Sequence, residues 1–231
     1  MDTSLSIPSV PKYDIIPTTH MKTNRPDSHP EPTIRRYPAY LRVIRDLMSA
    51  GEENISSAVV AEQLGLDPVL TRKDLAMAGV PGRPRRGYPA RKLADAIERA
   101  LGWNKGCGAL LVGVGSLGHA LLGYTGFAEQ NLSIVAAFDA DPLMIGQVVH
   151  NVRVRAMDDL PAIVADQKIK LGILTVPGTA AQACADALVQ AGVVGIWNFT
   201  PTQIDVPDGV IVQHVDLAQS LAVLSHAINR A

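Results

Sequence analysis

The sequence predicts an α/β protein in two parts, a small helical domain followed by a doubly wound parallel sheet. Residues 34–105 carry apolar side chains at three- and four-residue spacing, which is typical of amphipathic helices. Residues 106–231 alternate apolar strands with helices, a pattern that favours a parallel sheet covered on both faces. The low aromatic content of 4% fits a core of Val, Ile, Leu and Ala.

The two parts differ in net charge. Residues 34–105 hold 13 Lys and Arg against 8 Asp and Glu, and residues 106–231 hold 5 against 10. A basic part joined to an acidic part predicts that only the first meets a polyanion.

Several classes of protein are disfavoured. Cys107 and Cys184 lie far apart and fit no metal or redox spacing, which favours a reducing compartment. No run of about 18 apolar residues predicts a membrane span, and the N-terminus lacks a secretory signal. We therefore expect a soluble cytoplasmic protein without a metal site. Residues 1–33 are rich in Pro, Ser and Thr and predict a disordered or loosely docked tail.

The basic part, residues 34–105, has the pattern of a winged helix-turn-helix. A first helix ends near Gly51, and a short second helix, SSAVVAEQLG, has Ser56 or Ser57 as its N-cap. Asp67 and Pro68 then supply the cap and first-turn proline of a third helix, PVLTRKDLAMAG. A Gly/Pro/Arg stretch, VPGRPRRGY, predicts a wing, and PARKLADAIERALGW predicts a closing helix.

The third helix and the wing carry the candidate DNA-binding residues. A recognition helix places cations at phosphates and base edges of the major groove, and wing arginines suit phosphates or a narrow minor groove. The competing interpretation is a solvated, charged helix face. The predicted DNA contacts are Thr71, Arg72, Lys73, Arg83, Arg85 and Arg86.

In the second part, residues 106–231, the apolar pattern predicts a succession of strands and helices. The predicted strands lie at about 109–113, 133–138, 148–154, 171–176, 193–198 and 210–214. The predicted helices lie at about 116–127, 142–146, 158–166, 178–190 and 216–229.

The stretch GVGSLG follows the first of these strands and opens a helix. Gly113 permits a tight turn, Gly115 lets a pyrophosphate approach the backbone, and Gly118 allows close packing of helix on strand. Asp139 ends the next strand, where its carboxylate would bond the ribose hydroxyls and repel a 2′-phosphate. Asp141 is a nearby competitor for this role, but its position before Pro142 suits a helix start. The pattern predicts a Rossmann domain that binds NAD(H) rather than NADP(H). The competing interpretation is a packing turn without a ligand.

Two further segments follow neighbouring strands and are candidate walls of the cofactor crevice, LTVPGTAA at 174–181 and NFTP at 198–201. Plain strand-to-loop turns are the alternative. Together with the glycine turn, the candidate cofactor-binding residues are Gly113, Gly115, Ser116, Leu117, Gly118, Asp139, Thr175, Val176, Pro177 and Asn198. Histidines are scattered and the sheet leaves little room for a substrate domain, so no catalytic residue is predicted.

The two parts together resemble the Rex family of redox-sensing transcriptional repressors. The resemblance covers residues 34–230. The motifs that carry it are YLRVI (40–44), SS (56–57), RKDL (72–75), GRPRRGY (82–88), VGVGSLG (112–118), GYTGF (123–127), FDADP (138–142), LTVP (174–177), NFTP (198–201) and HVDL (214–217).

The resemblance implies a homodimer with a domain-swapped C-terminal helix, bound to palindromic double-stranded operator DNA and released when NADH accumulates. It implies an interdomain relay of Arg42, Tyr124 and Asp216, with Tyr124 reaching across the dimer, and it adds Asp216 to the cofactor-binding set. Two positions depart from the family pattern, Arg85 where glycine is common and Leu217 where Phe is frequent.

The sequence leaves three other functions open. They are an NAD-dependent oxidoreductase with a fused helical domain, a CoA- or nucleotide-binding module, and a DNA-binding protein whose second part only dimerises. The 3′-phosphate on the ribose of CoA makes Asp139 an argument against the second.

Overall fold

The computed structural model describes residues 29–230, which divide into two compact units, 29–104 and 105–230. Most of the predicted tail, residues 1–28, lies outside the described residues. The first helix already begins at Glu31, so the prediction of a tail that reaches residue 33 is slightly too long. Among the described residues, no helix combines the length and apolar character needed to span a bilayer.

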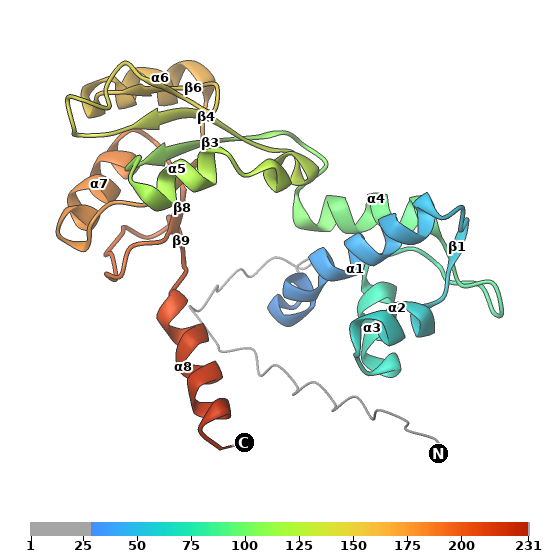
Figure 1. Cartoon of the computed structure of the whole chain (residues 1–231). Coiled ribbons are helices and arrows are strands. Elements are labelled where there is room, and N and C mark those ends of the chain that lie inside the picture. Colours follow the sequence, from blue (N-terminus) through green and yellow to red (C-terminus); the bar gives the residue numbers. More distant parts are fainter. Residues whose placement is uncertain (1–28, 231) are drawn as a thin grey trace. The chain divides into compact units, whose positions relative to one another are not determined.

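The first unit is a winged helix (Figure 1). Its helices are α1 (Glu31–Ser49), α2 (Ser57–Leu64), α3 (Pro68–Met77) and α4 (Ala90–Leu101), and its short strands β1 (Asn54–Ile55) and β2 (Tyr88–Pro89) pair antiparallel. The helices enclose one apolar core, in which the largest fully buried side chains are Tyr37, Tyr40, Leu41, Ile44, Ile55, Leu75, Leu93 and Ile97.

The helix ends of this unit follow from local chemistry. The Ser56 hydroxyl accepts a hydrogen bond from the Ala58 N–H (3.2 Å), and the Asp67 carboxylate accepts one from the Leu70 N–H (2.7 Å). Gly65 ends α2 in the left-handed conformation (φ +62°), which glycine adopts without steric cost. The predicted caps and the helix-turn-helix are confirmed.

The wing is a tight turn between α3 and β2. Arg83 and Gly87 exchange two backbone hydrogen bonds, of 2.8 and 2.9 Å. Gly87 has φ +77°, and a Cβ there would collide with the Ile55 carbonyl, so only glycine fits. Arg85 also lies in the left-handed region (φ +62°) at the tip of the turn.

The second unit is a doubly wound sheet with strand order β5-β6-β4-β3-β7-β8-β9. The strands are β3 (Cys107–Val112), β4 (Leu132–Phe138), β5 (Val148–Val149), β6 (Val152–Arg155), β7 (Leu171–Leu174), β8 (Gly195–Asn198) and β9 (Ile211–His214). From β6 to β9 the pairings are parallel, in the order of a Rossmann domain, and β5 adds an antiparallel edge.

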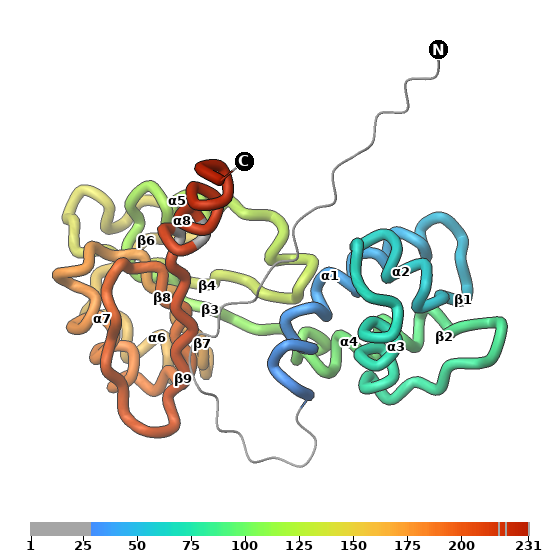
Figure 2. Tube along the Cα trace, turned by 90° about the horizontal axis from the view of Figure 1, so that it is seen from below, coloured from blue at the N-terminus to red at the C-terminus, as the bar shows by residue number. Residues whose placement is uncertain are grey.

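Alternate residues of β3 face opposite layers of helices. Leu110 and Val112 pack with α6 (Leu160–Gln167) and α7 (Gly178–Gln190) on one face of the sheet. Ala109 and Leu111 belong to the opposite core, which includes side chains of α5 (Ser116–Leu122). Figure 2 shows the strands of this unit running between the two layers. The short helices η1 (Thr125–Gln130) and η2 (Met157–Asp159) complete the connections.

Three predicted elements of this unit are corrected. The predicted strand 148–154 is the hairpin β5–β6, whose turn residues His150 and Asn151 both have positive φ. The predicted helix at 142–146 is a series of turns, and the predicted helix 116–127 ends at Leu122, before η1.

The last helix, α8 (Leu217–Ile228), follows β9 directly. The side chains of Leu217 and Ser220 lie outside the described residues. Every other side chain of α8 is exposed, and the large apolar ones are Leu221, Val223, Leu224 and Ile228. Figure 1 shows α8 standing away from the sheet of its own unit.

Candidate nucleotide- and DNA-binding sites

A cleft of about 440 Å³ opens at the carboxyl ends of β3, β4 and β7. Open α/β sheets bind their ligands at this edge, where the strand order reverses. The predicted residues that line the cleft are Gly113, Gly115, Asp139, Thr175, Val176 and Pro177. Ala180, in the predicted wall segment 174–181, also lines the cleft. The remaining lining residues are outside the predicted set and are Val112, Val114, Ala140, Asp141, Met144, Met157 and Cys184.

Each of the three glycines of the turn is required for a different structural reason. Gly113 has φ +95°, and a Cβ there would lie 2.8 Å from the Thr175 carbonyl oxygen. A Cβ on Gly118 would collide with the Gly113 carbonyl, so this glycine permits the helix to pack on the turn. A Cβ on Gly115 would meet nothing within 4 Å. Gly115 therefore keeps open the space that a pyrophosphate requires, and the residues present fit a dinucleotide.

Asp139 is held in place by backbone donors at the edge of this cleft. One carboxylate oxygen accepts a hydrogen bond from the Val114 N–H (2.6 Å) and the other from the Asp141 N–H (2.9 Å). Each oxygen keeps a second lone pair for a ribose hydroxyl. Burial and the charge of Asp139 raise the pKa of the Cys184 thiol, which keeps it in the protonated form.

Other predicted cofactor-binding residues lie outside this cleft. Ser116 and Leu117 are exposed on the first turn of α5. The Asn198 amide is fully buried, donates to the Thr202 carbonyl (2.9 Å), lies 3.1 Å from His214 Nδ1, and accepts from the Thr200 N–H (2.9 Å). The Asn198 side chain therefore shapes the loop after β8.

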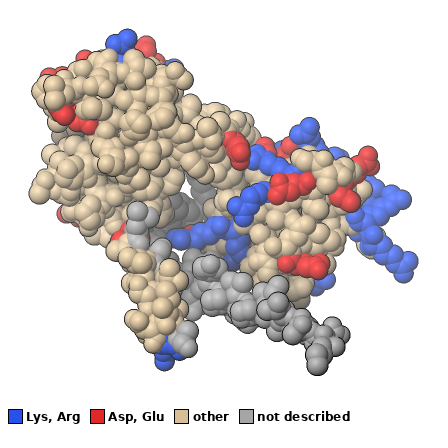
Figure 3. Space-filling view, viewed as in Figure 1, with Lys and Arg blue, Asp and Glu red and all other residues tan. Residues whose placement is uncertain are grey.

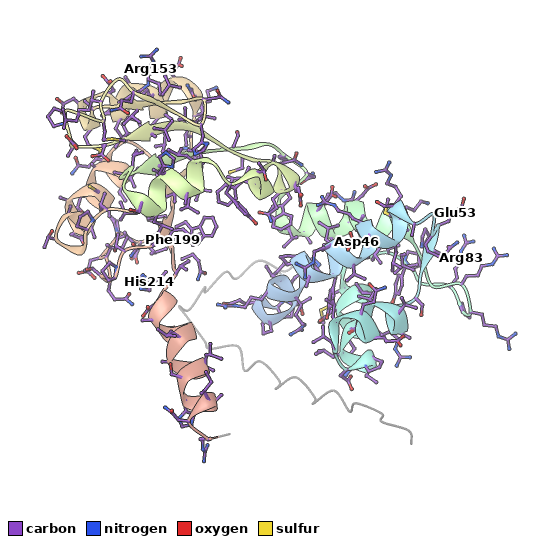
Figure 4. The ribbon with its side chains drawn as sticks, in the orientation of Figure 1. Asp46, Glu53, Arg83, Arg153, Phe199 and His214 are labelled. Atoms are coloured by element: carbon purple, nitrogen blue, oxygen red, sulfur yellow. The ribbon has the colours of Figure 1, made fainter. Side chains whose placement is uncertain are left out.

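Asp216, predicted for both cofactor and relay, caps α8 by accepting from the Ala218 N–H (2.8 Å). Its predicted relay partner Tyr124 is 56% exposed and packs edge-on against Phe127, with ring centroids 4.9 Å apart. Phe127 in turn contacts Trp197, which contacts Phe199. Figure 4 shows Phe199 and His214 near the ends of β8 and β9. The third relay residue, Arg42, is exposed on α1.

The first unit has a groove of about 960 Å³ between α3 and the wing, which also includes the start of α2. The predicted cations Arg72, Lys73, Arg83, Arg85 and Arg86 all line it, and all are exposed. Figure 3 shows Lys and Arg concentrated over the winged helix, and Figure 4 shows Arg83 extending from the wing. This arrangement suits a polyanion that lies across α3 and the wing.

The prediction for Thr71 is corrected. Its side chain is fully buried, and its hydroxyl donates to the Asp67 carbonyl (3.0 Å). A threonine hydroxyl often bonds the carbonyl one turn earlier, which turns the side chain toward its own helix. Thr71 thus fixes α3 to its core instead of facing a groove.

Asp74, which is not among the predicted site residues, anchors α3 to α1. Asp74 is 2% exposed, and its carboxylate accepts two hydrogen bonds from Arg36 (2.6 and 3.0 Å), one from the Tyr40 hydroxyl (2.7 Å) and one from Thr33 (2.9 Å). Burial alone would raise the pKa of Asp74, but these hydrogen bonds and the Arg36 charge hold it below its ordinary value.

The same cluster changes the neighbouring groups. Burial, followed by the hydrogen bond to Asp74, raises the pKa of the Tyr40 hydroxyl to about 12. A carboxylate on the face of α3 that also carries Leu75 was the available signal in the sequence, because an acid in a buried stripe requires partners.

Each of the two units matches a known protein family. Residues 30–76 match the family model described as a putative DNA-binding protein N-terminus, and residues 104–202 match the model described as a CoA binding domain. The redox-sensing transcriptional repressor Rex of Treponema denticola is 47% identical over 86% of this chain and 94% of its own length. The chain belongs to the Rex family.

Other relatives and solved structures agree with this assignment. The Rex repressor of Carboxydothermus hydrogenoformans is 41% identical over 87% of this chain and 97% of its own. RSP, solved as a Rex-family repressor, has been determined with β-NAD+ and operator DNA (TM-score 0.82, 34% identity, 87% of this chain and 93% of RSP). RSP has also been solved with β-NADH (TM-score 0.76, 33% identity, 87% and 95%). These Rex relatives are named as repressors, and the recognition of this family from the sequence motifs is confirmed.

Proposed function

We propose that this chain is a transcriptional repressor that senses the NADH/NAD+ ratio, binds operator DNA as a homodimer and leaves it when NADH binds. One observation carries the proposal. A single chain joins an open glycine cradle with Asp139 to a helix-turn-helix with exposed cations, and both units match RSP, solved with operator DNA and with either redox form of the nucleotide.

The dinucleotide would lie in the cleft at the carboxyl ends of β3, β4 and β7. Its pyrophosphate would lie over Gly115, where the backbone is open, and its ribose hydroxyls would bond Asp139. Asp141 lines the same cleft and adds negative charge against a 2′-phosphate. Ser116, Leu117, Asn198 and Asp216 stay proposals for cofactor contacts.

Burial of the nicotinamide ring can discriminate between the two redox forms, and no catalytic reaction is required. NAD+ carries a positive nicotinamide ring and NADH a neutral one. An apolar wall penalises the cation because an unpaired charge is costly to desolvate. Val112, Val114, Val176 and Pro177 supply apolar surface to this cleft.

The link to DNA would run through the dimer. The apolar residues Leu221, Leu224 and Ile228 of α8 are exposed and three to four residues apart, as expected for a helix that packs on a second copy of the chain. Closure of the two sheet units on NADH would change the separation of the two recognition helices, which must stay about 34–36 Å apart to read two half-sites. Arg42, Tyr124 and Asp216 are the proposed relay.

The absence of a catalytic step and the cellular location are two further parts of the proposal. We also propose that the chain acts by binding, without a catalytic step, and that it works in the cytoplasm. An oxidoreductase would instead show steady NADH turnover with a small carbonyl substrate.

Calorimetric titration of the full chain with NADH, NAD+, NADPH and CoA tests the ligand assignment. We expect NADH to bind more tightly than NAD+, with NADPH and CoA much weaker, and Asp139→Ala to relax the rejection of NADPH. Preferential binding of CoA, which the match to a CoA binding domain makes the main competitor, would contradict the proposal. Unchanged selectivity in Asp139→Ala would remove that carboxylate from the site.

A further inference from the structure

The outward face of α3 carries an exposed apolar residue, Val69, beside its cations. The buried residues Thr71, Asp74 and Leu75 define the inner face of this helix. The residues on the opposite side, at i, i+3, i+4 and i+7, are Val69, Arg72, Lys73 and Ala76. Val69 is 48% exposed and is the first residue of this outer stripe, one turn before the two cations.

The orientation of this stripe is fixed. The Asp74 carboxylate binds α1 through Arg36, Tyr40 and Thr33, and the Asp67 cap defines the first turn of α3. Val69 therefore cannot rotate into the core without breaking a buried ion pair. Leu70 is also exposed, but it lies on the flank of α3, about a quarter turn from the stripe.

In helix-turn-helix proteins the N-terminal residues of the second helix contact base edges in the major groove. Most polar atoms of those edges are hydrogen-bond donors and acceptors, and the only methyl group is the C5 methyl of thymine, where cytosine has a smaller C–H. A valine in the first turn has two methyl groups and no polar atom, so among these groups it gains most from contact with the thymine methyl.

We infer that Val69 reads a thymine in each operator half-site through contact with its C5 methyl, while Arg72 and Lys73 bind phosphates and polar base edges. Val69 thereby determines specificity at one base pair. The inference rests on the proposed DNA-binding function and extends it from the phosphate backbone to a base.

The test removes methyl groups first from the DNA and then from Val69. An operator is first selected from randomised DNA with the full chain, and each thymine is then replaced by deoxyuridine, which lacks only the methyl. We expect one thymine per half-site whose replacement weakens wild-type binding about fourfold, the value for losing one buried methyl group. Val69→Ala should bind the two DNAs equally, so that the double change adds nothing.

Leu70→Ala is the matched control, because it truncates an exposed apolar residue on the flank of the same helix. It should keep the wild-type sensitivity to deoxyuridine. Equal wild-type affinity for thymine and deoxyuridine at every position, or a Val69→Ala variant as sensitive as the wild type, would overturn the inference. Failure of the wild type to select any sequence would instead overturn the proposed function, and this inference with it.

Discussion

The two units build their candidate sites in opposite ways. In the winged helix, long charged side chains line the candidate groove, and a buried ion pair between Asp74 and Arg36 holds the helix that carries two of them. In the sheet unit, backbone lines much of the candidate cleft beside Asp139, and the turn there keeps its shape because Gly113, Gly115 and Gly118 lack side chains. The first site should therefore fail when groups are removed, and the second when groups are added.

The largest expected effect lies in the buried ion pair. Asp74→Asn should lower the free energy of unfolding of the winged helix by about 3–5 kcal/mol, because Arg36 is left without its partner. Glu31→Gln, which breaks the exposed Arg35–Glu31 pair on the same helix, should cost at most about 1 kcal/mol. Denaturant unfolding followed by circular dichroism measures both, and equal losses would contradict the account.

The same pair predicts a pH dependence. Because the folded-state pKa of Asp74 is lowered, its contribution is complete above the unfolded-state pKa of about 3.9 and is lost as pH falls toward the folded-state value. The stability difference between wild type and Asp74→Asn should shrink below about pH 4. Unfolding curves at pH 7 and pH 3 give the measurement, and a constant difference would exclude this role of the carboxylate.

A smaller effect is expected when a single methyl group is added to the glycine turn. Gly115→Ala fills open space, so it should weaken NADH about 100-fold, or about 2.7 kcal/mol, with an unchanged melting temperature. Gly118→Ala meets the Gly113 carbonyl and should lower both the affinity and the melting temperature. Calorimetry and thermal unfolding separate the two, and a Gly115→Ala variant with normal affinity would mean that no phosphate lies there.

Removing cations from α3 should change how strongly the operator affinity depends on salt concentration. Arg72→Ala with Lys73→Ala should abolish specific operator binding and reduce the slope of log affinity against log salt by about 0.9 for each phosphate that the protein no longer neutralises. Arg91→Ala with Lys92→Ala removes the same charge from the exposed face of α4, outside the groove, and should change the slope little. NADH affinity should stay normal in both, and equal slopes for the two double variants would exclude α3 as the DNA-binding helix.

The smallest expected effect concerns communication. Arg42→Ala should leave NADH and operator affinities intact and reduce their coupling, which in such switches is about 1–3 kcal/mol. Operator titrations with and without NADH measure the coupling in the variant and in Arg35→Ala, a control on the same helix. A normal NADH response in Arg42→Ala would exclude it from the relay.

The sequence predicts best what neighbouring residues decide. The caps at Ser56 and Asp67, the glycine turn and the position of Asp139 depend on local chemistry, and the structure brings Gly115 and Asp139 to one cleft. The hairpin at His150 and Asn151 was missed because neither turn residue is a glycine or a proline.

Side-chain direction was harder to predict, because it depends on partners distant in sequence. Asp74 finds its partners 34 to 41 residues away in α1, and Asn198 finds His214 on the neighbouring strand. No local pattern specifies these contacts, and they decide which residues of each site are available to a ligand.

Coupling between the two sites is the central claim, and one measurement tests it directly. The affinity of the full chain for its selected operator is determined with saturating NAD+ and with saturating NADH at the same salt concentration. The account predicts that NADH weakens operator binding at least fivefold relative to NAD+, with an equal reciprocal loss of NADH affinity on the operator. Identical operator affinities with the two nucleotides would contradict it.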